Sequence, residues 1–249
     1  MSVPTLGPET WMLAAIAALC IGLAKGGFGG LGMVAVLLMA QVLPARESTG
    51  AILPMLITAD IFAVKAYHQH ADRKLVLRLL WPALAGIVCG WLLMPHIPAH
   101  VFGRVIGWLT LGLIVLVLIQ KYGGNMLKFA AEHPGFAWPF GWLAGITTML
   151  ANAAGPVMTI YLLACKLPKM EFVGTAAWFF LTVNLVKVPF STSLGLINGS
   201  SLTLNLILAP LVIGGVFVGR WLIKKVNQQV FEWLMILFSL AGAIRLILK

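Results

Sequence analysis

The sequence predicts an all-α polytopic membrane protein, and three observations lead to this fold class. Of the 249 residues, 61% are hydrophobic and only 10% are charged, whereas a soluble domain carries roughly 25% charged residues. Several apolar stretches reach the length of about 20 residues that a helix needs to cross a bilayer. These stretches also repeat, with one interrupted stretch and three continuous ones in each half of the chain. A membrane β-barrel is excluded, because runs such as 109–119 lack the alternation of barrel strands.

Composition also limits the partners and the chemistry. The formal net charge is +10, which in a membrane protein indicates orientation and contact with anionic lipids rather than nucleic acid. The first 24 residues contain no Lys or Arg, so we expect the first apolar segment to be retained rather than cleaved as a signal peptide. No metal and no cofactor is expected, because the cysteines show neither pairing nor metal-ligand spacing. They are Cys20, Cys89 and Cys165.

The chain consists of two membrane repeats, 8–121 and 134–249, which together form one transport domain. Corresponding positions lie 123 to 129 residues apart, and examples are Gly22/Gly145, Gly32/Gly155, Gly50/Gly174, Asp60/Asn184 and Pro82/Pro210. In each repeat a broken apolar segment precedes three continuous ones. We expect these segments near 10–43, 50–68, 79–95 and 101–120, and then near 137–165, 172–191, 201–220 and 229–248.

Both broken segments are interrupted by residues that suit a turn. The interruptions are Lys25-Gly26-Gly27-Phe28-Gly29-Gly30 and Asn152-Ala153-Ala154-Gly155-Pro156. The flanking pieces 10–24 and 31–43 would each measure about 20 Å as helices, which is less than the hydrocarbon core of about 30 Å. Irregular backbone at this depth is tolerated only where protein buries it or a wet cavity surrounds it. We therefore predict a re-entrant broken-helix hairpin followed by three transmembrane helices in each repeat.

The distribution of Lys and Arg decides between two topologies. If the broken segments crossed the membrane, the repeats would be parallel, and the two sides would carry eight and seven basic residues. If they turn back, the repeats are inverted, and one side carries four: Arg46, Arg104, Arg245 and Lys249. The other side then carries eleven: Lys65, Arg73, Lys74, Arg78, Lys121, Lys128, Lys166, Lys169, Arg220, Lys224 and Lys225. Because basic residues are enriched on the cytoplasmic side, we predict inverted repeats with both termini on the periplasmic, outer side.

The two hairpin tips form the predicted binding site. In transporters with inverted repeats, discontinuous helices meet near the bilayer centre and bind the substrate there. The second helix of each hairpin would aim its N-terminus at this centre, which favours an anion. Pro156 suits the first position of such a helix. The tip residues assigned to the substrate are Lys25, Gly29, Gly30, Asn152 and Gly155.

Further polar residues lie inside the continuous segments, where charge is costly and marks functional sites. Lys187 is assigned to the anion with Lys25, although it lies four residues before a loop, where snorkelling is easier. Asp60 either neutralises Lys25 as a structural pair or relays a proton, and the sequence leaves both roles open. Asn184, at the corresponding position, offers similar hydrogen bonding without charge and joins the site. Thr175 is a weaker candidate, because threonines in membrane helices often bond to their own backbone.

Two stretches of the chain carry a family resemblance. The first is Gly22-Leu23-Ala24-Lys25-Gly26-Gly27-Phe28-Gly29-Gly30. The second comprises Gly145, Ala154-Gly155-Pro156 and Ile160-Tyr161-Leu162, followed by Phe172-Val173-Gly174-Thr175, Asn184 and Lys187. Both stretches resemble motifs of the TauE/SafE family, also called the 4-toluene sulfonate uptake permeases. The resemblance covers nearly the whole chain.

The resemblance implies a bacterial inner-membrane transporter for a small sulfur-containing anion. The lysine after Gly-Leu-Ala is most similar to the sulfite-exporter branch, so we expect sulfite export by alternating access. Uptake of an organosulfonate or another organic anion is the alternative, and a channel would differ by unsaturable flux. An enzyme is not expected, because the sequence offers no nucleophile–base pair and no paired cysteines. The glycines of 86–90 and 214–219 permit close packing within or between subunits, so a homodimer stays open.

Overall fold

The computed structural model describes residues 7–43, 45–96, 98 and 134–248, with single positions between 101 and 118. The regular structure in these ranges is helical: α1 (Pro8–Gly26), α2 (Leu31–Val42), α3 (Ala45–Tyr67), α4 (Arg73–Leu93), α7 (Ala137–Ala151), α8 (Ala154–Ala164), α9 (Lys169–Ser193), α10 (Gly199–Lys225) and α11 (Gln228–Leu248). Short 3-10 turns at His68–His70 and Pro134–Phe136 complete it. The all-α prediction is confirmed, while the segment expected at 101–120 lies largely outside the described residues.

Five helices of the described part are long and apolar enough to cross a membrane. They are Pro8–Gly26, Glu47–His70, Arg73–Leu93, Lys169–Ser193 and Gly199–Lys225. Large apolar side chains on their outer faces are exposed, as on Trp81, Leu206, Phe217 and Trp221. An apolar bilayer solvates such faces, whereas water would not. The chain is therefore a multi-pass membrane protein.

The first predicted interruption is present, and it is shorter than expected. Helix α1 continues through Lys25 and ends at Gly26, and Gly27 follows with a φ of 144°, which a glycine adopts without steric cost. Residues 27–30 separate α1 from α2. At 19 residues, α1 measures about 28 Å, so the expectation that its piece is too short to span is wrong. Helix α2, with 12 residues, is too short.

The second interruption is also present, at Asn152 and Ala153. Asn152 ends α7 in the left-handed conformation, with a φ of 50°, which asparagine tolerates better than most residues. Helix α8 begins at Ala154, so Pro156 occupies the third helical position rather than the predicted first. A proline is still tolerated there, because the N–H groups of the first turn have no partner within the helix.

Each broken segment folds back on itself. Helix α1 packs beside α2, and α7 packs beside α8. A Cβ added at Gly32 would lie 3.7 Å from the Cβ of Ala24, across the first break. Consecutive helices that pack side by side form hairpins rather than one continuous span.

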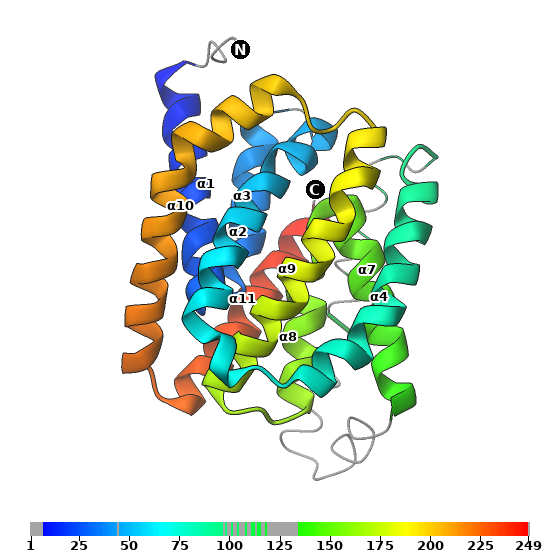
Figure 1. Ribbon diagram of the computed structural model, residues 1–249, viewed down its shortest axis with the longest axis vertical. Coiled ribbons are helices and arrows are strands. Elements are labelled where there is room, and N and C mark those ends of the chain that lie inside the picture. The colour runs from blue at the N-terminus through cyan, green and yellow to red at the C-terminus, as the bar shows by residue number, and fades with distance from the viewer. Residues whose placement is uncertain are drawn as a thin grey trace.

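Helices at corresponding positions of the two predicted repeats run in opposite directions (Figure 1). Helices α3 and α9 are antiparallel, since Gly50 lies against Leu196 while Gly174 lies against Tyr67. The six helices form two sets, and the helices within each set are parallel. Helices α1, α3 and α10 run downwards in Figure 1, and α4, α7 and α9 run upwards. Each of the pairs α1/α7, α3/α9 and α4/α10 therefore has one member in each set.

Glycines join each hairpin to a helix of the other repeat. A Cβ at Gly22 would lie 2.7 Å from the Cα of Gly215, so α1 and α10 are in backbone contact. A Cβ at Gly145 would lie 2.9 Å from the Cα of Gly86, which joins α7 to α4 in the same way. We call these two contacts the glycine seams. Each hairpin is thereby in backbone contact with one helix of the other predicted repeat, α10 or α4.

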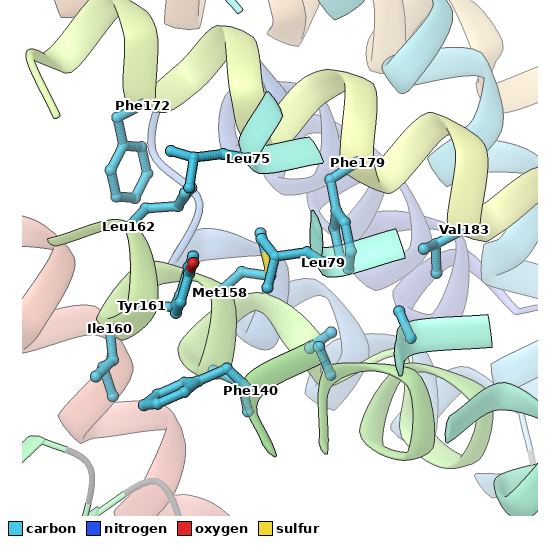
Figure 2. Close-up of a cluster of buried hydrophobic side chains, with 14 of the residues drawn as sticks. Leu75, Leu79, Phe140, Met158, Ile160, Tyr161, Leu162, Phe172, Phe179 and Val183 are labelled. Carbon is cyan, nitrogen blue, oxygen red and sulfur yellow. The ribbon is translucent and has the colours of Figure 1, made fainter. Parts of the chain in front are cut away.

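The apolar core is divided between the two hairpins. One cluster combines α7 and α8 with α4 and α9, and Figure 2 shows Leu79, Phe140, Met158 and Phe179 meeting in it. The other cluster combines α1 and α2 with α3 and α10. The polar residues of the site lie between these two apolar bodies, on α1, α3, α7 and α9.

Candidate functional site

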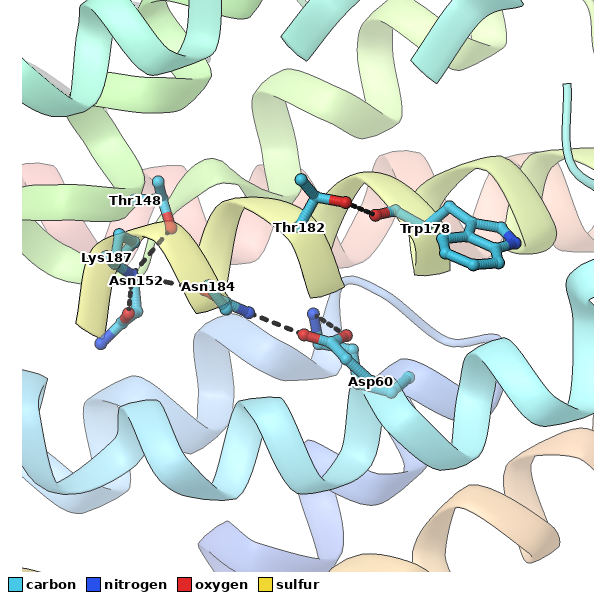
Figure 3. A network of polar contacts seen from close by, with 8 residues as sticks. Asp60, Thr148, Asn152, Trp178, Thr182, Asn184 and Lys187 are labelled. Carbon is cyan, nitrogen blue, oxygen red and sulfur yellow. Dashed lines mark hydrogen bonds and ion pairs between the residues drawn. The ribbon is translucent and has the colours of Figure 1, made fainter. Parts of the chain in front are cut away.

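The polar centre of the molecule begins with an ion pair between α1 and α3. The Lys25 Nζ lies 2.8 Å from Asp60 Oδ1; the lysine side chain is 12% exposed and the aspartate is fully buried. The other carboxylate oxygen, Oδ2, accepts a hydrogen bond of 2.7 Å from Asn184 Nδ2 on α9 (Figure 3). Both carboxylate oxygens are therefore engaged, as a buried charge requires.

The same network continues from α9 to the second hairpin tip. Lys187 is 1% exposed, and its Nζ donates to Asn152 Oδ1 at 2.6 Å and to Thr148 Oγ1 at 3.1 Å. A longer contact of 3.5 Å joins it to Asn184 Oδ1. Figure 3 shows these contacts in one row, from the tip of α7 along α9 to α3. Lys187 is thus fully inside the protein, and the snorkelling alternative is wrong.

The network carries an excess of positive charge. It contains the ammonium groups of Lys25 and Lys187 and the single carboxylate of Asp60. Uncompensated charge in an apolar interior is strongly unfavourable. An anion that entered beside the two lysines would balance the charge, so the electrostatics favour an anionic ligand.

A cavity of about 70 Å³ lies beside this network. Because about 10–15 Å³ of such space holds one water molecule, the cavity has room for a few waters or one small anion. Its polar lining consists of Lys25, Thr148, Asn152, Thr159 and Asn184. The remaining wall is largely apolar and includes Met33, Leu56, Met158, Phe172 and Phe180.

The structure brings most of the predicted site residues to this cavity. Lys25 and Asn184 line it, together with tip residues Gly29, Asn152 and Gly155. A Cβ added at Gly155 would lie 3.7 Å from the Gly29 carbonyl oxygen, so the two hairpin tips meet. The cavity is therefore formed where the two hairpin tips meet.

Three predicted site residues do not line the cavity: Gly30, Thr175 and Lys187. Lys187 lies behind it and reaches it through Thr148 and Asn152. Thr175 lies at the other end of the α3–α9 contact, where its Oγ1 accepts a hydrogen bond of 2.9 Å from the Asp72 backbone N–H.

The tip amides are used differently from the prediction. At the start of α2 the N–H groups of Leu31, Gly32 and Met33 donate to carbonyls of Phe28, Gly29 and Gly30. These three donors are therefore satisfied within the first tip. Asn152 is also occupied at both ends, because its Nδ2 donates to the Thr49 carbonyl at 2.9 Å while its Oδ1 accepts from Lys187.

Two residues of the site were missed by the sequence analysis. Thr148 lines the cavity and accepts a hydrogen bond from Lys187. The repeat could have identified it, since Thr148 lies 123 residues after Lys25. Phe180 lies with its ring centroid 3.9 Å from Lys25 Nζ. No sequence signal separates this phenylalanine from its apolar neighbours on α9.

The donor set fits neither a metal ion nor a catalytic centre. Across the ranges that the structure describes, no group of three His, Cys, Asp or Glu side chains could hold a metal ion. The polar groups around the cavity are ammonium, amide and hydroxyl groups, which together recognise oxyanions. This donor set favours a small anion as the ligand.

Comparison with known proteins identifies one family. The family model described as sulfite exporter TauE/SafE matches residues 14–246. Comparisons with curated proteins and with solved structures gave no match. The matched range contains every residue of the polar network and both hairpins, except for the first six residues of α1.

Proposed function

Since the chain belongs to the TauE/SafE sulfite exporter family, we propose that it exports a small sulfur oxyanion, with sulfite as the substrate. Members of this family are membrane transporters and not enzymes. The observation that carries the proposal is the buried network of two lysines and one aspartate next to a cavity of about 70 Å³. A cavity of this size and charge suits a small anion.

Lys25 is the primary anion-binding group in this proposal. Its Nζ is held by Asp60 on one side and by the Phe180 ring on another, and its side chain lines the cavity. The Thr148 hydroxyl and the second amide hydrogens of Asn152 and Asn184 offer directed hydrogen bonds from the same wall. Lys187 adds positive charge from behind this wall, and Gly29, Gly30 and Gly155 let the anion approach the tip backbone.

Asp60 balances Lys25 while the cavity holds no anion. The ion pair of 2.8 Å with Lys25 supports a structural role for Asp60 as the counter-ion of that lysine. If transport is coupled to a proton, Asp60 is the group that would bind it. Thr175 acts indirectly here, because its hydroxyl joins α9 to the start of α4 through Asp72.

The transport cycle we propose is alternating access by two inverted repeats, 8–121 and 134–249. The opposite directions of α1/α7, α3/α9 and α4/α10 support it, as does the meeting of the two tips at the cavity. In such transporters one structural unit rocks against the other around a central site. The predicted topology places eleven basic residues on one side of the membrane and four on the other. The side with eleven is then the cytoplasmic side, and both termini lie outside.

The membrane potential supplies a driving force for export. A negative interior favours exit of an anion by about 2.3 kcal/mol per charge per 100 mV. Export therefore needs no obligate coupling ion, whereas uptake would need one. Uptake would need groups that bind a coupling ion. Asp60 is the single carboxylate of the described network, and this favours export over uptake.

A second candidate function is uptake of an organosulfonate or another organic anion. The apolar part of the cavity wall favours it, because Val36, Leu162, Phe172 and Val173 could hold an apolar substituent. The small volume opposes it. Competition between sulfite and a bulky sulfonate separates the two functions.

The test is sulfite flux into and out of proteoliposomes that contain the purified protein. Lys25→Ala and Lys187→Ala should each lower the saturable flux at least about tenfold, which corresponds to the loss of one charge-assisted contact. Lys74→Ala is the matched control, since Lys74 is exposed at the start of α4. Wild-type flux in both cavity variants would refute the site. Flux of a bulky sulfonate but not of sulfite would favour the second candidate.

A further inference from the structure

One contact between a hairpin tip and a neighbouring helix is present in only one of the two repeats. At the second tip, Asn152 Nδ2 donates to the carbonyl of Thr49 at 2.9 Å. Thr49 is the fifth residue of α3. The tip of the α7–α8 hairpin is thereby tied to the first turns of α3.

The corresponding positions in the other repeat are Gly29 and Val173. Gly29 lies 123 residues before Asn152, and Val173 lies 124 residues after Thr49. Val173 is also the fifth residue of its helix, α9. Both Gly29 and Val173 line the cavity, and a Cβ added at Gly29 would meet no atom within 4 Å. Space is therefore open at the first tip, where the second tip has a hydrogen bond.

We infer that two residue pairs, Asn152–Thr49 and Gly29–Val173, are the gates of the transporter and that they close alternately. In the present state the Asn152–Thr49 gate is closed and the Gly29–Val173 gate is open. Because α3 and α9 are antiparallel, their fifth residues lie at opposite ends of this helix pair. The inference rests on the proposed function and on the inverted repeats, and it assigns the outer gate to Asn152–Thr49.

The packing indicates which parts move. Helices α3 and α9 are in tight contact near both ends, at Gly50 with Leu196 and at Gly174 with Tyr67. They form the fixed part. Each hairpin is joined by its glycine seam to α10 or α4, so each hairpin moves together with that helix.

The bound anion itself can release the closed gate. Lys187 Nζ donates to Asn152 Oδ1 at 2.6 Å, and this contact helps to hold the Asn152 side chain toward Thr49. An anion in the cavity competes with Asn152 for Lys187. Loss of that contact frees Asn152 to leave the Thr49 carbonyl, which opens the outer side.

The experiment uses pairs of cysteines in a background without Cys20, Cys89 and Cys165. One pair is Thr49→Cys with Asn152→Cys, and the other is Gly29→Cys with Val173→Cys. Gly90→Cys with Met149→Cys is the control pair, because it joins α4 to α7, which move together, and a Cβ at Gly90 would lie 2.9 Å from the Met149 Cβ. Each pair is treated with a short thiol crosslinker in proteoliposomes, with and without sulfite.

The first pair should crosslink without sulfite, and the linked protein should show less flux than the same variant before linking and after cleavage of the link. Sulfite should slow this link about threefold or more and speed the second one, as a ligand that shifts a two-state population does. The control pair should not respond. Normal flux with the Thr49–Asn152 link in place would overturn the gates while leaving the proposed function intact.

A variant with all four gate cysteines separates the two hypotheses further. Alternating gates allow one link or the other in a given molecule, and mass spectrometry of intact protein counts the links. Molecules that carry both links would overturn the inference whatever the flux assay shows. Absence of sulfite flux in the cysteine-free protein, with mutually exclusive links, would instead refute the proposed substrate alone.

Discussion

Asn184 Nδ2 and Asp60 Oδ2 are joined by a hydrogen bond of 2.7 Å, and the two residues occupy corresponding positions of the two repeats, 124 residues apart. Contact between two corresponding positions is what the predicted inverted repeats imply at the axis that relates them. The Asn184–Asp60 contact thus supports the predicted repeats, and it lies within the polar network. Its chemistry is nevertheless asymmetric, because one repeat supplies the carboxylate and the other supplies the amide.

Exchanging these two side chains tests the asymmetry. Asp60→Asn leaves Lys25 without its counter-ion, and loss of one partner of a buried pair costs about 3 kcal/mol or more. We expect a marked fall in the melting temperature in detergent. The double variant Asp60→Asn with Asn184→Asp restores one carboxylate to the centre of the network, next to Lys187. It should recover part of the lost stability.

The single variant Asn184→Asp is the control for the exchange. It places two carboxylates in direct contact, so it should also be less stable than the wild type at neutral pH. A double variant whose loss of stability equals the sum of the two single losses would show that the residues do not interact.

Phe180 is expected to position Lys25 for the anion. The ring lies 3.9 Å from Lys25 Nζ, and a contact of this kind contributes about 0.5–1 kcal/mol or more when desolvated. Phe180→Leu should raise the KM for sulfite roughly two- to tenfold with a smaller change in maximal rate, while Phe180→Tyr should retain the wild-type KM. Phe217→Leu, on the exposed face of α10, is the control. An unchanged KM in Phe180→Leu would exclude the positioning role.

The glycine seams predict a selective response to an added methyl group. A Cβ at Gly145 would lie 2.1 Å from the Ala83 carbonyl oxygen, and one at Gly22 would lie 2.2 Å from that of Val212. Gly145→Ala and Gly22→Ala should each destabilise the protein by about 1–3 kcal/mol, the usual cost of overpacking. Gly214→Ala is the matched control, since a Cβ there meets nothing within 4 Å. Thermal unfolding in detergent measures all three, and a lower melting temperature for the Gly214 variant alone would contradict the packing.

The predicted topology can be tested by labelling single cysteines. Ser200→Cys, in the exposed start of α10, should react with an impermeant thiol reagent added to intact cells, and Lys74→Cys should react only after lysis. Both side chains are exposed, so neither result depends on unfolding. The reverse labelling pattern would show that the protein has the opposite orientation in the membrane. Labelling of both cysteines from outside would refute the prediction that these residues lie on opposite sides.

The helices and the two breaks could be predicted from the sequence, because apolar length and glycine clusters act locally. The pairing of Lys25 with Asp60 was one of two roles that the sequence left open for that aspartate, and the structure shows the ion pair. The extent of α1 was underestimated, because Lys25 is accommodated in its last turn by Asp60 and Phe180. Such support comes from other helices and leaves no mark on the local sequence.

The depth of Lys187 and the occupation of Asn152 could not be predicted. Both depend on the way α9 passes the second hairpin tip, which brings Lys187 to Thr148 and Asn152. The number of residues to the next loop says little about depth when the helix extends to Ser193. Helix packing, rather than periodicity, decides these contacts.

The glycine seams also bear on how such a protein could arise. Each hairpin is held by a helix of the other repeat, α1 by α10 and α7 by α4. A chain of half the length would have no internal partner for its own hairpin. A second copy in the opposite orientation would supply that partner.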